Sequence, residues 1–112
     1  QNYALAKARY QEGLTLLRAF DSPTYTAWCL EGFAAAACAQ GDYAQATRLC
    51  AAAAALREQV QTPLPAAERV AFEQTVAAAK AELDEATFVQ EWTAGSALSQ
   101  DQAIDDALSE TH

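Results

Sequence analysis

The chain of 112 residues has the length of a single domain, and its formal net charge is −8. Alanine, the strongest helix former, accounts for 29 residues, whereas only five residues are valine or isoleucine. This composition predicts an all-α fold and leaves little material for a β-sheet.

The first helices are separated by clear stop and start signals. Apolar residues at spacings of three and four predict a helix over about 2–20. Ser22 is a suitable N-cap for a second helix over about 24–39, and Pro23 suits its first helical position. Gly41 supplies a left-handed stop after that helix.

Similar signals mark the third and fourth helices. Asp42 is expected to cap a helix over about 43–60, with Gln45 three residues on as its capping-box partner. The segment 62–65 contains two prolines and breaks the chain. Pro65 then opens a fourth helix, which runs to about residue 83.

Two shorter helices complete the chain. Asp84 is expected to cap a fifth helix, which Gly95 ends. Ser99 and Gln102 have the spacing of a capping box for a last helix near the C-terminus.

A near-repeat lies 40 residues apart, where Tyr3-Ala4-Leu5-Ala6 recurs as Tyr43-Ala44-Gln45-Ala46. Self-similarity on this scale is typical of stacked helical hairpins, which bury their apolar faces on one another. The pattern therefore predicts hairpin repeats over 1–62, namely one half repeat and one full repeat. Residues 63–112 are expected to form capping helices within the same compact domain.

The second and third predicted helices resemble one tetratricopeptide repeat, with small and bulky residues where that motif places them. The resemblance implies antiparallel α-α hairpins in a right-handed superhelix, closed by a short helical C-terminal cap. The residues that carry it, and that we expect to pack the repeat, are Leu30, Phe33, Ala34, Ala37, Gly41, Tyr43, Ala46, Cys50 and Ala53.

A longer resemblance covers about three quarters of the chain. The order of segments 29–34, 39–49, 63–69 and 95–104 is similar to the C-terminus of large bacterial LuxR-like or adenylate-cyclase-like regulators, which carry an ATPase module. It implies that the chain is the C-terminal part of such a transcriptional regulator or signalling ATPase. Its partner would then be another protein or the rest of a longer chain.

Function is accordingly expected to lie in binding. The only histidine, His112, is terminal, and no nucleotide-binding glycine loop occurs, so we expect neither catalytic residues nor a metal or cofactor site. The expected role is a non-enzymatic protein-interaction or structural module; the alternative is a sensor that binds a small effector in a concave groove. The residues expected to line that groove are Tyr25, Trp28, Cys29, Gly32, Ala35 and Ala36.

The first predicted helix has an apolar flank without an upstream partner. We therefore expect self-association, for example as a homodimer, through Tyr3, Leu5, Tyr10, Leu14 and Leu17.

Charge and cysteine usage limit the other partners. The last 32 residues hold eight acids and no base, which disfavours direct contact with nucleic acid. That acidic segment is either a solvated surface or a docking site for a basic partner. The absence of a long apolar segment argues against a membrane span, and three cysteines without CxxC spacing fit a cytoplasmic protein.

Overall fold

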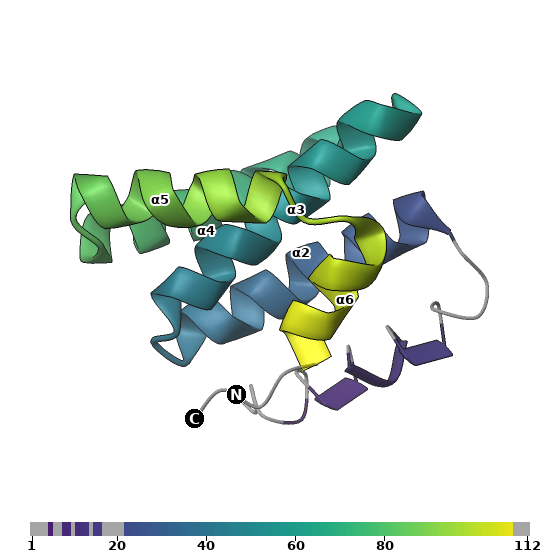
Figure 1. Cartoon of the computed structure of the whole chain (residues 1–112), viewed down its shortest axis with the longest axis horizontal. Coiled ribbons are helices and arrows are strands. Elements are labelled where there is room, and N and C mark those ends of the chain that lie inside the picture. Colours follow the sequence, from purple (N-terminus) through teal and green to yellow (C-terminus); the bar gives the residue numbers. More distant parts are fainter. Residues whose placement is uncertain (1–4, 6–7, 10, 14, 17–21, 109–112) are drawn as a thin grey trace.

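The computed structural model describes residues 5, 8–9, 11–13, 15–16 and 22–108. All described residues before 17 are helical, and no strand occurs in the described part of the chain. Five helices follow, in the order α2 (Pro23–Ala39), α3 (Tyr43–Val60), α4 (Ala66–Glu82), α5 (Glu85–Ser96) and α6 (Gln100–Leu108) (Figure 1). The all-α prediction is confirmed.

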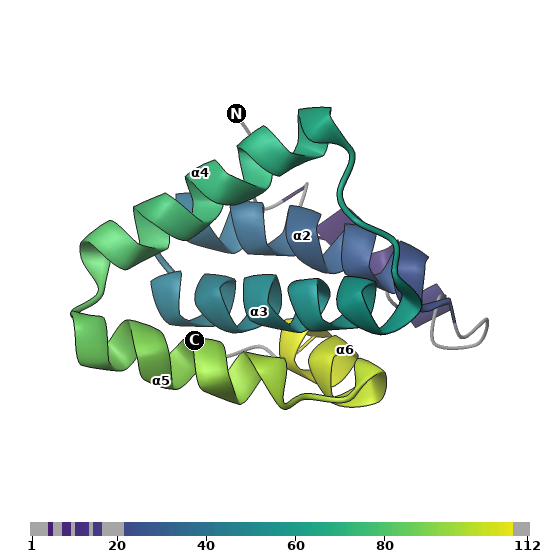
Figure 2. The same ribbon diagram turned by 90° about the horizontal axis from the view of Figure 1, so that it is seen from above.

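Helices α2 and α3 form an antiparallel hairpin whose ends match the predicted signals (Figure 2). The Ser22 hydroxyl accepts a hydrogen bond from the Tyr25 backbone N–H at 3.4 Å, and Pro23 occupies the first turn. At the other end of α2, Gly41 has a φ of 89°, and the Asp42 N–H donates to the Ala37 carbonyl at 2.9 Å. This six-to-one bond around a left-handed residue is a Schellman motif.

The predicted capping box at the start of α3 is only half right. Asp42 caps the helix, since its Oδ1 accepts from the Gln45 N–H at 3.3 Å. The Gln45 side chain does not reach back, because the Schellman motif already uses the Asp42 N–H. Gln45 is instead buried, and its Nε2 donates to the Asp106 carbonyl of α6 at 2.9 Å.

Helices α5 and α6 begin at the predicted caps, whereas α4 begins one residue later than predicted. Asp84 Oδ1 accepts from the Thr87 N–H at 2.7 Å at the start of α5. Ser99 and Gln102 exchange side-chain and backbone hydrogen bonds of 2.9 Å and 3.1 Å, which is a complete capping box. Pro65 is the N-cap of α4 rather than its first helical residue, and its extended ψ of 153° explains the shift.

The prediction that Gly95 ends the fifth helix is wrong. Helix α5 continues through Gly95 to Ser96, and Gly95 is buried against α3. A Cβ at this position would lie 2.2 Å from the Arg48 carbonyl oxygen. Gly95 is therefore needed because two helix backbones approach closely, and not because the chain turns.

Helix α3 is the centre of the described molecule. Helix α5 lies along one side of α3, and α4 crosses α2 and α3 on the other (Figures 1 and 2). Helix α6 lies across the hairpin, with Gln100 near Thr26 at the start of α2 and Asp106 near Gln45 at the start of α3. Helices α4 and α5, which a further repeat would pair, separate from their shared turn and have few contacts with each other. The hairpin is thus observed, whereas the right-handed superhelical array stays a prediction.

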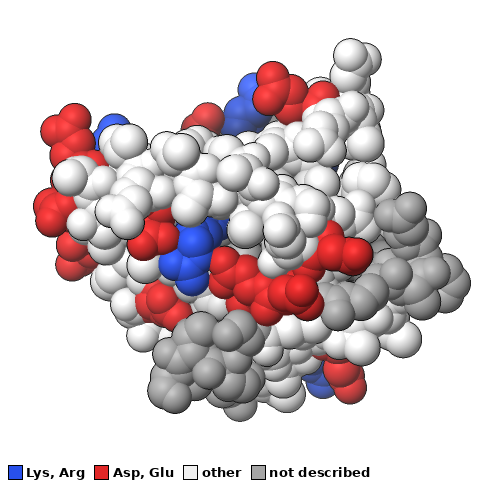
Figure 3. Space-filling view, viewed as in Figure 1, with Lys and Arg blue, Asp and Glu red and all other residues white. Residues whose placement is uncertain are grey.

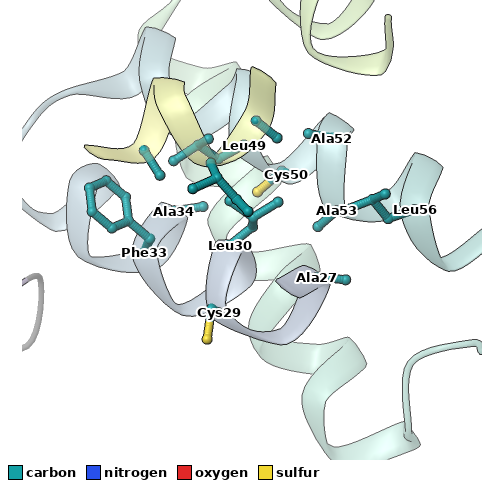
Figure 4. Packing of buried hydrophobic residues seen from close by; sticks show 13 residues of the cluster. Ala27, Cys29, Leu30, Phe33, Ala34, Leu49, Cys50, Ala52, Ala53 and Leu56 are labelled. Atoms are coloured by element: carbon teal, nitrogen blue, oxygen red, sulfur yellow. The ribbon is translucent and has the colours of Figure 1, made fainter. Parts of the chain in front are cut away.

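The core lies between α2 and α3 and is closed by α6 (Figure 4). Small side chains on facing positions let the two backbones approach, and larger ones fill the remaining space. Of the residues expected to pack the repeat, Tyr43 is partly buried, Gly41 occupies the turn, and those that are fully buried are Leu30, Phe33, Ala34, Ala37, Ala46, Cys50 and Ala53. Ile104 of α6 is also fully buried in this cluster.

Helices α2 to α6 are between 9 and 18 residues long. None of them combines the length and the apolar character needed to span a membrane.

Candidate functional site

An open groove runs between α2 and the first half of α4, and Trp28 lies where its two parts join. One part, of about 450 Å³, lies beside the 62–65 segment and includes Tyr25, Pro63 and Pro65. The other part, of about 240 Å³, continues along α2 past Gly32 and Ala35 toward Phe72 of α4. We refer to both parts together as the α2/α4 groove.

Four of the six residues predicted to line a groove lie here. Tyr25, Trp28, Gly32 and Ala35 follow one another at spacings of three and four, which places them along one face of α2. Tyr25 is 57% exposed and Trp28 is 45% exposed, so both rings remain accessible.

The other two predicted groove residues, Cys29 and Ala36, are buried, so that part of the prediction is wrong. Their exposed fractions are 3% and 4%, and each follows a groove residue by one position. One residue rotates the side chain by about 100° around a helix, which moves both onto a neighbouring face. Figure 4 shows the Cys29 sulfur directed away from the other labelled core residues, and it is 3.5 Å from the position that a Cβ on Gly13 would occupy.

The two exposed rings form a pair at the end of the groove. Their centroids are 5.7 Å apart and their planes are tilted by 52°. This arrangement is within the favourable range for aromatic pairs and holds both rings in place on one helical turn. The groove therefore presents a large aromatic surface that is already oriented.

A buried ion pair fixes the floor of the groove. Arg57 of α3 binds Glu31 of α2 through two hydrogen bonds, of which Nη2 to Oε1 measures 2.9 Å. Arg57 Nη1 also donates to the Thr62 carbonyl at 3.3 Å and so ties down the segment between α3 and α4. The paired charges cancel locally and connect α2, α3 and the 62–65 segment to one another.

Glu68 is the remaining charged side chain that lines the groove. It lines both parts of the groove from α4, as Trp28 does from α2. It is exposed, and among the described residues it takes part in no ion pair. The α2/α4 groove thus combines aromatic surface with one unneutralised carboxylate.

A second polar cluster joins α3, α5 and α6 on another face of the molecule. Arg48 Nε donates to Asp106 Oδ2 at 2.7 Å, and its Nη1 donates to Glu91 Oε1 at 2.8 Å. Hydrogen bonds from Arg48 to Asp106 and then to Glu91 raise the pKa of the guanidinium above its ordinary value, although desolvation opposes them. Figure 3 shows a basic patch on this face of the molecule with acidic side chains around it.

This cluster changes the interpretation of the acidic C-terminal third. Glu91 and Asp106 are neither simple solvated surface nor a docking site for a basic partner, because both form ion pairs with Arg48. Sequence reasoning missed the arrangement since Arg48 is 43 and 58 positions away from these acids. The exposed acids Glu82 and Glu85 remain solvated surface near the α4–α5 turn.

The three cysteines do not form a disulfide. Burial raises the pKa of Cys50 to about 12, and it also raises the pKa values of Cys29 and Cys38. In the described part of the chain, no three histidine, cysteine or acidic side chains gather as metal ligands would. His112 lies outside the described residues.

The predicted self-association surface is described only in part. Tyr3, Tyr10, Leu14 and Leu17 lie outside the described residues, whereas Leu5 is half exposed. Leu16, which the prediction did not include, is the most exposed of the large apolar side chains described.

The chain matches no protein-family model, and neither the curated proteins nor the solved structures include a significant match.

Proposed function

We propose that this chain is a non-enzymatic protein-interaction module, with the α2/α4 groove as its binding surface. The observation that carries the proposal is the exposure of Tyr25 and Trp28, side by side, in an open apolar groove. Tryptophan and tyrosine are the residues most often found as binding hot spots, because they bury a large area at a small entropic cost.

The frame around the rings supports the same role. The Arg57–Glu31 pair and the Ser22 cap fix the helix that carries the rings relative to the 62–65 segment. A surface that is already ordered loses less entropy when a partner binds, and so retains more of its interaction energy as affinity.

The shape of the groove favours a macromolecular partner over the alternative of a small effector. Small-molecule sites usually enclose most of their ligand, often 70–90% of its surface. The α2/α4 groove is open to solvent, most widely beside the 62–65 segment, and its accessible lining surface is mainly apolar. An extended peptide or a protein loop would fit such a surface better than an enclosed effector.

The wider setting rests on the resemblance alone. On that basis we propose that the module belongs to the helical C-terminal part of a cytoplasmic regulator or signalling ATPase. Its partner is then a second protein or another part of a longer chain.

Selection from a random-peptide phage library tests the proposal without knowledge of the partner. Selected peptides should bind the chain and shift the backbone NMR signals of residues around Tyr25 and Trp28. Trp28→Ala should weaken their binding by tenfold or more, which is the range of a hot-spot residue. Val89→Ala, which removes an exposed apolar side chain from α5, is the matched control and should leave binding unchanged.

Two results would overturn the proposal. One is a failure to select any peptide under conditions where the chain is folded. The other is a set of peptides whose binding is insensitive to Trp28→Ala, since they would use another surface.

A further inference from the structure

The chemistry of the groove narrows the class of partner. This inference rests on the function proposed above and concerns the same surface. Three charged side chains line the groove, and two of them, Glu31 and Arg57, neutralise each other. Glu68 is left as the one net charge, so the groove itself is anionic.

The surroundings add to the negative potential. A recess of about 620 Å³ between α3 and α4 adjoins the groove and is lined by Glu58, Glu73 and Arg69, in addition to Arg57. Because Arg57 is paired with Glu31, the remaining charges of the recess, Glu58, Glu73 and Arg69, leave one further negative charge beside the groove. A cationic partner is therefore attracted to this side of the molecule, whereas an acidic peptide is repelled.

The position of Trp28 adds a specific contact for a cation. Trp28 and Glu68 line the same two cavities from opposite helices. The indole ring is the strongest natural partner for an ammonium or guanidinium group, and arginine stacks on it particularly well. An arginine or lysine side chain placed between them would make a cation–π contact with the indole and an ion pair with the carboxylate, while its aliphatic part packs on the indole.

We infer that the α2/α4 groove binds a basic, extended peptide segment, with an arginine or lysine placed between Trp28 and Glu68. Apolar residues of the peptide, next to that cation, contact Tyr25, Pro63 and Pro65 of the groove. The occupant is thus a peptide of mixed basic and apolar character, rather than a purely apolar helix or an acidic tail.

Three synthetic heptapeptides test this inference. Each contains leucine and proline in the same order, with arginine, neutral citrulline or glutamate at two matched positions. Binding is followed by tryptophan fluorescence in a Trp92→Phe background, in which Trp28 is the only tryptophan. We expect the arginine peptide to bind about tenfold more tightly than the citrulline peptide, and the glutamate peptide to bind more weakly still.

Substitution of the carboxylate supplies the matched comparison. Glu68→Gln should weaken the arginine peptide about fivefold at low salt and leave the citrulline peptide unchanged. Glu82→Gln removes an exposed acid from the far end of the same helix and should have little effect. Equal losses from Glu68→Gln and Glu82→Gln would overturn the inference, because diffuse charge would then explain the preference.

The remaining outcomes separate this inference from the proposed function. If arginine and citrulline peptides bind equally and Trp28→Ala weakens both in calorimetric titrations, which need no tryptophan, the groove binds peptides but does not recognise a cation. If no heptapeptide changes the Trp28 emission at millimolar concentration, the inference fails, while the phage-selected peptides still decide the proposed function.

Discussion

Replacing Gly95 by alanine tests how closely α5 approaches α3. In most helices this substitution stabilises, because alanine exceeds glycine in helix propensity by about 1 kcal/mol. At Gly95 the added Cβ would lie 2.2 Å from the Arg48 carbonyl oxygen and 2.8 Å from two further Arg48 backbone atoms. Ordinary contacts of this kind begin at 3.4 Å, so the two backbones must separate by more than 1 Å.

The cost of that separation exceeds the gain in propensity. Overpacking costs about 1–3 kcal/mol, and backbone atoms cannot rotate away as a flexible side chain could. The shift would also stretch the 2.8 Å contact between Arg48 and Glu91. We take the upper end of the range, about 3 kcal/mol, and subtract the propensity gain of about 1 kcal/mol. The expected net loss is about 2 kcal/mol, or a fall in Tm of roughly 10 °C.

Thermal and urea unfolding followed by circular dichroism measure this change. Gly13→Ala is the matched control, since among the described residues its added Cβ would meet Cys29 Sγ alone, at an ordinary 3.5 Å. The control should be neutral or slightly stabilising. A Gly95→Ala protein at least as stable as the wild type would refute the reasoning, because α5 could not then lie against the Arg48 backbone as described.

Three further predictions concern the core, the cysteines and the surface. Ala46→Lys places an unpaired charge in a fully buried contact and should lower the free energy of unfolding by more than about 4 kcal/mol. Urea unfolding measures this loss, and the exposed control Ala77→Lys should change the free energy of unfolding little. Burial raises the Cys50 pKa to about 12, so the neutral thiol contributes its full stabilisation below pH 9, and this contribution is lost as the pH rises toward 12. At pH 8 a disulfide reagent should therefore label Cys38 well before Cys50, and equal labelling rates would contradict this. Leu16→Lys should reduce self-association in light scattering, and a wild-type chain that stays monomeric at high concentration would remove the basis for that expectation.

Local signals predicted most of the helix boundaries. In caps such as Ser22, Asp84 and the Ser99–Gln102 box, the donor and the acceptor of each hydrogen bond are three residues apart. A short segment of sequence is therefore enough to predict the cap. The buried stripe of α2 also follows from spacing, because a helix repeats every 3.6 residues. These parts of the fold depend on short-range geometry.

The errors arose where a second helix decides what a residue does. Gly95 was expected to end a helix because that is the commonest local use of glycine, but α3 requires it for close packing. Gln45 had the spacing of a capping box, but α6 supplied a better acceptor for its buried side chain. Spacing along one helix cannot reveal which neighbour will cover it.

The candidate site shows the same division. Tyr25 and Trp28 could be found from the sequence, since both lie on one face of a predicted helix. Cys29 and Ala36 were grouped with them although each follows a groove residue by one position, which turns its side chain by about 100° onto a neighbouring face of α2. Glu68 was not identified, because nothing local indicates that α4 crosses α2 with this residue on the facing side.

The contacts of α6 have a consequence for the order of events in folding. Its partners lie far back in the chain: Gln45 and Arg48 are 61 and 58 residues from Asp106, and Thr26 is 74 residues from Gln100. Closing such long loops costs entropy that is recovered only when the α2–α3 hairpin already offers a docking surface. We therefore expect Ile104→Ala to accelerate unfolding while leaving the refolding rate almost unchanged in stopped-flow measurements, and a comparable slowing of refolding would place α6 in the nucleus instead. The rate at which α6 detaches from the hairpin then determines the unfolding rate, and with it the lifetime of the folded state.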